Sequence, residues 1–145
     1  MSNNRIDTIL AAHKTIAESS FSPVELKKGY ADRTLRIDLS CNDISINPVS
    51  QEMKDRWTGG KGFDLWLMFN EINPGTKWDS PENPICFSSG PLGGTTSFPG
   101  SGKTVVTAIS PLTNIVIDSN VGGYFGPFLK FSGFDALCII GKAKE

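Results

Sequence analysis

Glycine clusters punctuate residues 98–142 and constrain the fold more than any other feature of this 145-residue sequence. Two β-branched runs lie between the clusters, at residues 104–109 and 114–118. Glycines this dense between apolar strands indicate that the backbone turns sharply or approaches a neighbour that a Cβ atom would exclude. Backbone amides presented at such turns can bind anions. Ordinary turns in a β-rich domain are the simpler alternative, and composition alone leaves both open.

The composition is that of one globular domain, with 39% hydrophobic and 20% charged residues. A formal net charge of -1 provides no basic field that would attract a nucleic acid. No apolar run approaches the roughly 20 residues that span a bilayer, and the polar N-terminus lacks the pattern of a signal peptide. We therefore expect a cytoplasmic protein with no membrane span and no nucleic-acid partner.

The cysteines argue against a metal cluster bound by this chain alone. Cys41, Cys86 and Cys138 are scattered, odd in number and never arranged as CxxC. This spacing disfavours a disulfide framework and a self-contained zinc or iron–sulfur site. Cys138 lies in an apolar strand pattern, which favours a buried, inert thiol.

Periodicity predicts an α+β fold with a mixed or antiparallel sheet and two or three short helices. Alternating apolar residues predict a β-hairpin over residues 33–48, with its turn at 40–43. Further strands are expected at 84–88, 104–110, 114–118 and 136–141. Short helices are expected at 51–57, 63–72 and 122–131. The apolar run in the second of these helices indicates core packing on one face, and contact with another subunit or domain is possible for the other.

Residues 5–18 have helical spacing of apolar residues and predict an amphipathic helix. Its apolar face could dock on a partner subunit or cap the surface of its own domain. His13 is the only histidine and has no acidic neighbour on the helix, so it is not a candidate base.

The segment Gly100–Thr104, GSGKT, invites interpretation as a nucleotide phosphate loop. The P-loop motif requires a glycine five residues before Gly102, where this chain has Ser97. A phosphate loop must also open into a helix, whereas the residues that follow here are strand formers. Phosphate or nucleotide binding through this segment is therefore the weaker hypothesis.

A series of longer motifs is more specific. They are YADRTLRIDLS (30–40), GGKGF (59–63), GPLGGT (90–95), GSGK (100–103), SPLT (110–113), DSNVGGYFGPFLKFSGFDA (118–136) and IIGKAK (139–144). Over roughly the last three-quarters of the chain, these motifs resemble the N-terminal domain of the aldehyde ferredoxin oxidoreductases, in the same order and spacing. Those enzymes hold tungsten or molybdenum between two pterin dithiolenes. The resemblance implies a division into an N-terminal helical extension, residues 1–28, and a pterin-cofactor-binding type of domain, residues 29–145, that is partial relative to the family.

The resemblance also implies cofactor-binding residues. Lys103 matches a family arginine that contacts a pterin phosphate, and it keeps the positive charge but loses the bidentate fork. Asn120, Gly122 and Gly123 match residues that lie against the bis-pterin cofactor. The Asn120 backbone carbonyl matches one that binds the magnesium ion bridging the two phosphates, which suits a hard cation. Val121 stands where the family has a serine.

The implied function is that of a cofactor-cradling small subunit or partial domain. Family enzymes oxidise aldehydes to carboxylic acids and pass electrons through a [4Fe–4S] cluster to a ferredoxin-type carrier. No residue of this chain matches a catalytic acid, base or nucleophile, so the cluster and the active site are expected on a larger partner subunit. A non-catalytic paralogue that uses the same fold as an interaction module is the main alternative.

Overall fold

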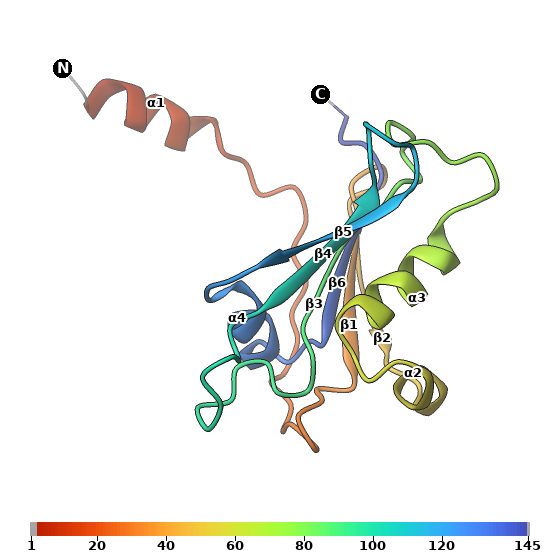
Figure 1. Ribbon diagram of the computed structural model, residues 1–145. Helices are drawn as coiled ribbons and strands as arrows, with labels where there is room; N and C mark the ends of the chain where they lie inside the picture. Colours follow the sequence, from red (N-terminus) through yellow and green to blue (C-terminus); the bar gives the residue numbers. More distant parts are fainter. Residues whose placement is uncertain (1–2, 145) are drawn as a thin grey trace.

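The computed structural model describes residues 3–144 and shows one mixed sheet with helices on both sides (Figure 1). The strand order is β2-β1-β6-β3-β4-β5. The strands are β1 Arg33–Asp38, β2 Asp43–Pro48, β3 Ile85–Ser88, β4 Thr104–Ile109, β5 Val116–Val121 and β6 Ala136–Ile140. β1 and β6 are parallel and every other neighbouring pair is antiparallel, which confirms the expected α+β class.

The predicted hairpin is confirmed. β1 and β2 pair antiparallel, with Leu35 opposite Ile46 and Ile37 opposite Ile44. Asn42 turns the chain with a φ of 58°, a left-handed conformation that asparagine tolerates better than most residues. The alternation of apolar and polar residues predicted this hairpin, although most residues of both strands are half-buried.

Four helices lie within the described residues: α1 Asn3–Ala12, α2 Gln51–Arg56, α3 Lys61–Glu71 and α4 Phe125–Phe131. α2 begins at Ser50, whose hydroxyl accepts a hydrogen bond of 3.0 Å from the Met53 amide, as an N-cap serine does. α2 and α3 agree with the predicted helices to within two residues. α4 begins three residues after the expected start, because the two glycines before Tyr124 remain outside it.

α3 covers one face of the sheet and closes the main core. Met68 packs there with Cys86, Ile109 and Cys138, all 6% exposed or less. Phe63, at the start of α3, is fully buried in a second cluster with residues from the α2 region. The expected burial of Cys138 is confirmed. The outer face of α3 remains open, with Phe69 80% exposed.

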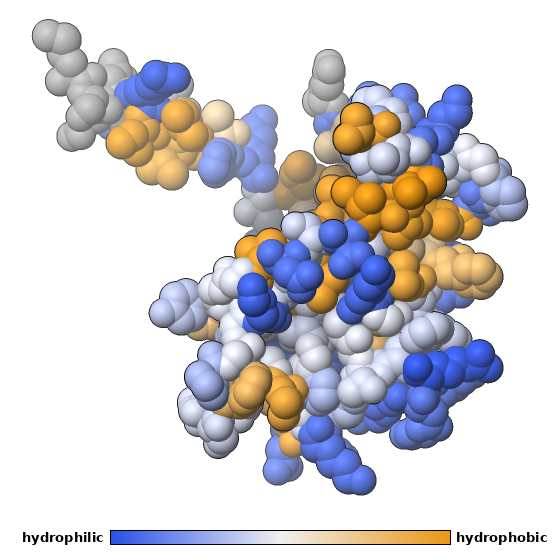
Figure 2. Space-filling model, in the orientation of Figure 1, coloured by the Kyte–Doolittle hydropathy of each residue, from blue (hydrophilic) through white to orange (hydrophobic). Residues whose placement is uncertain are grey.

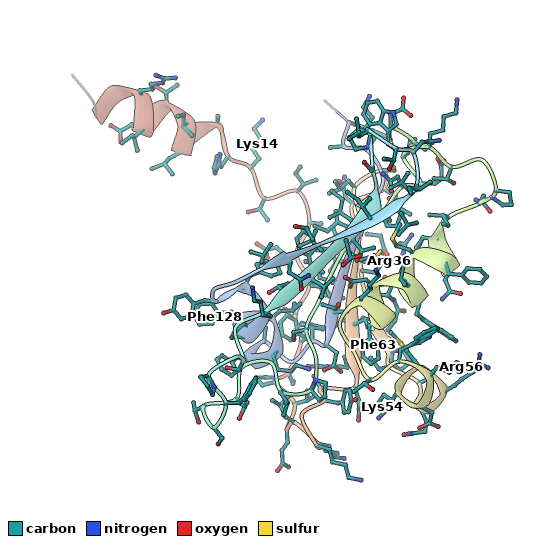
Figure 3. All side chains as sticks on the ribbon, viewed as in Figure 1. Lys14, Arg36, Lys54, Arg56, Phe63 and Phe128 are labelled. Atoms are coloured by element: carbon teal, nitrogen blue, oxygen red, sulfur yellow. The ribbon has the colours of Figure 1, made fainter. Side chains whose placement is uncertain are left out.

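Arg36 ties β1 to the end of α3. Its guanidinium donates hydrogen bonds of 2.6 and 3.0 Å to the two carboxylate oxygens of Glu71, and Figure 3 shows it reaching toward that helix. This bidentate pair, together with Asp38, raises the pKa of Arg36 above its ordinary value.

α4 and the chain between α1 and β1 lie on the opposite face. Phe125 of α4 packs on Phe87, which points away from α3 because its neighbour Cys86 points toward it. The rings of Phe21 and Phe134 pack edge to face with their centroids 4.9 Å apart, and the Arg33 guanidinium lies over both rings. These contacts hold the segment before β1 against the sheet.

A buried ion pair links two segments that lie far apart in the sequence, residues 29–32 and residues 130–135. Lys130 of α4 is 1% exposed and Asp135 is fully buried, and the two form a salt bridge. Asp135 also accepts hydrogen bonds from the amides of Ala31 and Asp32, at 3.0 and 2.8 Å. Lys130 donates to the Gly29 carbonyl at 3.0 Å. The pair therefore fixes the turn before β1 to the connection between α4 and β6.

The prediction of a helix over residues 5–18 is wrong at its C-terminal end, since α1 ends at Ala12. α1 stands away from the body of the molecule (Figure 1), and Figure 2 shows hydrophobic residues on its surface. Ile6, Ile9 and Leu10 are 57%, 51% and 62% exposed. A helix that is not buried against the rest of the protein depends on the intrinsic helix propensity of its residues. The β-branched residues after His13 lower that propensity. α1 does not cap its own domain, and docking on a partner stays a prediction.

The predicted strand at 114–118 is also shifted, because β5 extends to Val121. Asn114 has a φ of 55° and closes the turn that follows β4, with its amide bonded to the Ser110 carbonyl at 2.8 Å. Pairing with β4 then continues as far as Thr104 opposite Val121. Asn120 and Val121 are therefore strand residues rather than loop residues.

No helix within residues 3–144 is long and apolar enough to cross a membrane.

Candidate functional site

The glycine-rich segments meet at one edge of the sheet. Because β4 runs antiparallel to β3 and β5, its first residues lie beside the last residues of both neighbours: Val105 pairs with Ser88 on one side and with Asn120 on the other. The loop of residues 89–103 and the turn of residues 122–124 therefore leave the sheet together. We call these two segments, together with residues 59–61 and the adjoining Asn120, the glycine edge.

The four predicted cofactor-binding residues lie together on this edge. Lys103 immediately precedes Thr104 and Gly122 immediately follows Val121, and those two strand residues are paired. The backbones behind them are in close contact: a Cβ atom on Gly102 would lie 2.8 Å from the Gly123 carbonyl oxygen. The fold thus brings Lys103 next to Asn120, Gly122 and Gly123.

Gly122 and Gly123 face open space. A Cβ atom built on either would meet no atom of the described chain within 4 Å. Gly123 has a φ of +120°, which by itself favours glycine, but the φ of Gly122 lies outside the left-handed range. Nothing in the described part of the chain thus requires glycine at position 122. Absence of a side chain there leaves room for the backbone to approach an external group.

Gly126, at the start of α4, is closely packed, in contrast to the open space around Gly122. A Cβ atom there would lie 2.6 Å from the Thr104 hydroxyl and 3.2 Å from the Lys103 carbonyl oxygen. This glycine lets α4 pack directly on the beginning of β4. The strand and the helix therefore hold the turn of residues 122–124 from both sides.

The start of α3 completes the edge. The Gly60 amide donates to the Ser89 carbonyl at 3.3 Å, and the Ser88 hydroxyl donates to the Gly60 carbonyl at 2.7 Å. A Cβ atom on Gly60 would lie 3.7 Å from the Val105 side chain, which is paired with Asn120. The GGKGF motif is therefore close to the predicted residues, although it is far from them in sequence.

The two lysines of the edge differ in their partners. Lys61 lies 2.5 Å from an Asp118 carboxylate oxygen. Lys103 is exposed and has no ion-pair partner within residues 3–144. The Asn120 side chain makes no hydrogen bond to the described residues either. Lys103 and Asn120 are thus free to contact an external anion or cation-bound phosphate.

Asp64 lies beneath the edge and was missed by the sequence interpretation. Its side chain is fully buried, and one oxygen accepts a hydrogen bond of 2.9 Å from the Thr107 hydroxyl. The other carboxylate oxygen has no partner among the described residues. Burial raises the pKa of Asp64 to about 7, and the charge of Asp118 adds to the rise, whereas the hydroxyls of Ser88 and Thr107 oppose it. An aspartate within the apolar run FDLWLMF was the available signal.

The arrangement presents an exposed lysine beside open glycine backbone, groups of the kind that bind phosphate. Within residues 3–144 no group of three histidine, cysteine, aspartate or glutamate side chains could hold a metal ion. Lys103 leads directly into β4 rather than into a helix, so the GSGKT segment lacks the strand–loop–helix context of a nucleotide phosphate loop.

The sequence model of the aldehyde ferredoxin oxidoreductase N-terminal domain matches residues 34–145. The chain belongs to the aldehyde ferredoxin oxidoreductase family. Tungsten-containing aldehyde ferredoxin oxidoreductases from Pyrococcus furiosus and Pyrococcus horikoshii are 40% and 41% identical to it over 113 and 115 residues. Those alignments cover 78% and 79% of this chain. A further relative, the WOR-like subunit of an aliphatic sulfonate oxidoreductase from Pyrococcus furiosus, is 31% identical over 121 residues.

A solved structure has the same fold. It is the active-site complex BamBC of benzoyl coenzyme A reductase, with a TM-score of 0.76 and 29% sequence identity over 81% of this chain. The chain spans 18% of that structure's chain and 18–19% of the length of the relatives above. What the family shares over this span is one domain of a much larger enzyme. The resemblance drawn from the motifs is confirmed, whereas the roles of single residues and the boundary at residue 29 stay predictions.

Proposed function

We propose that this domain cradles a tungsten- or molybdenum-bis-pterin cofactor at its glycine edge. The observation that carries the proposal is the open backbone at Gly122 and Gly123, beside an exposed Lys103 that has no ion-pair partner among residues 3–144. No contact made by those residues explains the missing side chain at position 122, but a bulky ligand pressed against the backbone would. When bound, the metal–pterin group would supply the redox and oxygen-transfer chemistry of the enzyme.

Each residue of the edge has a defined role in this proposal. The Lys103 ammonium would neutralise a pterin phosphate, and the open backbone at Gly122 and Gly123 would let the chain approach that phosphate closely. The Asn120 backbone carbonyl would be a ligand for a magnesium ion, a hard cation that prefers oxygen. The hydrogen bonds of β5 to β4 hold Asn120 rigidly, which suits a residue that positions an ion.

A larger oxidoreductase subunit is the proposed partner, carrying the [4Fe–4S] cluster and the catalytic residues and passing electrons to a ferredoxin-type carrier. The surface around the glycine edge supports this partner. Leu92, Tyr124, Phe128 and Phe131 are 60%, 77%, 62% and 58% exposed, and Figure 3 labels Phe128 on the outer side of α4. Large apolar side chains at this density mark a surface that a partner covers.

Aldehyde oxidation to a carboxylic acid is the proposed reaction of the assembled enzyme, since the most similar relatives described above are aldehyde ferredoxin oxidoreductases. The other two proteins described above are named for different substrates, an aliphatic sulfonate and benzoyl coenzyme A. Because one domain type accompanies three kinds of substrate, this domain contributes cofactor binding and not substrate selection. Substrate contacts would come from the partner.

The test is anaerobic purification of the tagged chain from its native cells, with tungsten, molybdenum, iron and phosphate measured in the complex. We expect a larger partner, pterin-bound metal and iron in the wild-type complex. Lys103→Met and Gly122→Val should lower the metal content at least several-fold. Lys77→Met, an exposed lysine in the polar loop beyond α3, is the matched control and should leave it unchanged.

A wild-type complex with a partner but without tungsten or molybdenum would refute cofactor binding and favour the non-catalytic interaction module. Equal metal content in the wild type, Lys103→Met and Gly122→Val would refute the assignment of the site to this edge. Circular dichroism of each variant ensures that a loss of metal does not reflect unfolding.

A further inference from the structure

Two cysteines face each other at the centre of the sheet. Cys86 of β3 and Cys138 of β6 are directly opposed residues in an antiparallel register. β6 and β3 are the third and fourth strands of the six, so this pair lies where the two halves of the sheet join. Both thiols are free, and their residues are 0% and 2% exposed. The expected function of the domain uses neither of them.

The register brings the pair within reach of a covalent bond. Directly opposed residues of antiparallel strands have Cα atoms about 4.5 or 5.5 Å apart, and their side chains share one face. A disulfide needs a Cα separation of about 4.4–6.8 Å, so both kinds of antiparallel pair fall within this range. The neighbouring Cys138 thiol, together with burial, raises the pKa of Cys86.

We propose that Cys86 and Cys138 form a modification site, a cross-strand dithiol that a small peroxide closes to a disulfide. One thiol, as the thiolate, attacks a peroxide oxygen and becomes a sulfenic acid, and the O–O bond breaks to release water. The sulfur of the second cysteine then attacks the sulfenic sulfur, forms the S–S bond and releases a second water. Two thiols are oxidised, and one hydrogen peroxide is reduced to two water molecules.

The environment makes this reaction slow but reversible. Reaction begins with a thiolate, and a buried thiol with a raised pKa supplies little of it near neutral pH. Met68 of α3 packs over the pair, so the peroxide must enter during local opening of that helix. Opposed Cβ atoms in a sheet lie about 4.5–5.5 Å apart, more than the roughly 3.8 Å of a disulfide, so closure strains the strands and leaves the bond easily reduced.

Closure would join the two halves of the sheet covalently. β6 lies in the half with β1 and β2, and β3 lies in the half with β4 and β5, which carries the glycine edge. Ser88, at the end of β3, is two residues from Cys86 and bonds to the start of α3. The disulfide would therefore tie the strands that support the edge without touching its exposed residues.

The test uses the full chain with Cys41→Ser, which removes the exposed thiol, prepared reduced under anaerobic conditions. After hydrogen peroxide treatment in native buffer, we expect both remaining thiols to be lost and the mass to fall by two hydrogen atoms. A non-reducing digest should contain a peptide linking Cys86 to Cys138, and dithiothreitol should restore both thiols. Cys138→Val in the same background keeps the core volume similar and should form no intramolecular disulfide.

Retention of both thiols in folded protein would overturn the proposal. Conversion of either sulfur to sulfinic acid without a cross-link would overturn it as well. Circular dichroism before and after treatment shows whether the chain remains folded, so that a disulfide formed only after unfolding is counted against the proposal. None of these outcomes depends on whether the glycine edge binds a cofactor.

Discussion

Asp64 is expected to make the stability of the domain depend on pH. The carboxyl group is fully buried beneath β4, and burial raises its pKa from an ordinary 3.8 to about 7. The folded chain therefore binds a proton at Asp64 that the unfolded chain releases between about pH 4 and pH 7. Stability should fall as the pH rises through this window, because the unfolded state binds fewer protons there, and then level off above about pH 7.

The magnitude follows from the pKa difference. At about 1.4 kcal/mol per pKa unit, a rise from 3.8 to about 7 corresponds to roughly 4 kcal/mol of lost stability at pH 8 relative to pH 4. Asp64→Asn replaces the carboxyl group by a neutral amide of the same size, whose oxygen can accept the Thr107 hydrogen bond. The variant should match the wild type near pH 4 and exceed its stability increasingly up to about pH 7, above which the difference should level off.

Urea unfolding followed by circular dichroism at several pH values between 4 and 8 measures this difference. Asp79→Asn, an exposed aspartate in the polar loop of residues 76–83, is the matched control and should show a constant difference from the wild type. If the stability gained by Asp64→Asn does not change with pH, the carboxyl group ionises normally and the reasoning from its burial is refuted.

Two further predictions concern the packing that supports the glycine edge. Lys130→Met leaves the buried Asp135 carboxylate without its cation and should lower the free energy of unfolding by about 3–5 kcal/mol. Arg56→Met, which removes an exposed ion pair, is the control and should change that free energy by less than about 1 kcal/mol. Equal effects of the two variants in urea unfolding would contradict the role of burial. At position 126 a Cβ atom alone would lie 2.6 Å from the Thr104 hydroxyl, so Gly126→Val should lower the free energy of unfolding by about 1–3 kcal/mol. An unchanged midpoint of thermal unfolding would show that α4 can move away from β4 at little cost.

Local patterns in the sequence were sufficient for the β1–β2 hairpin and for helix α3, which were predicted to within a few residues. Alternating apolar residues favour an extended strand and a longer apolar run favours a helix, because these spacings follow from the geometry of the element itself and not from its contacts. The extent of α1 was overestimated because helical spacing does not reveal whether anything covers the apolar face. β5 was misplaced because all six of its residues are exposed, so burial left no periodic signal.

The family and the predicted cofactor-binding residues follow from the motifs alone, because motifs in a fixed order can be recognised without any knowledge of contacts. Which distant segments meet depends on the fold: it places Lys103 beside Gly122, Gly60 beside Val105, and Cys86 opposite Cys138. It also revealed Asp64, whose unusual pKa depends on burial between α3 and β4. Pairing register and burial involve residues far apart in the chain, and a single sequence contains no direct signal for either.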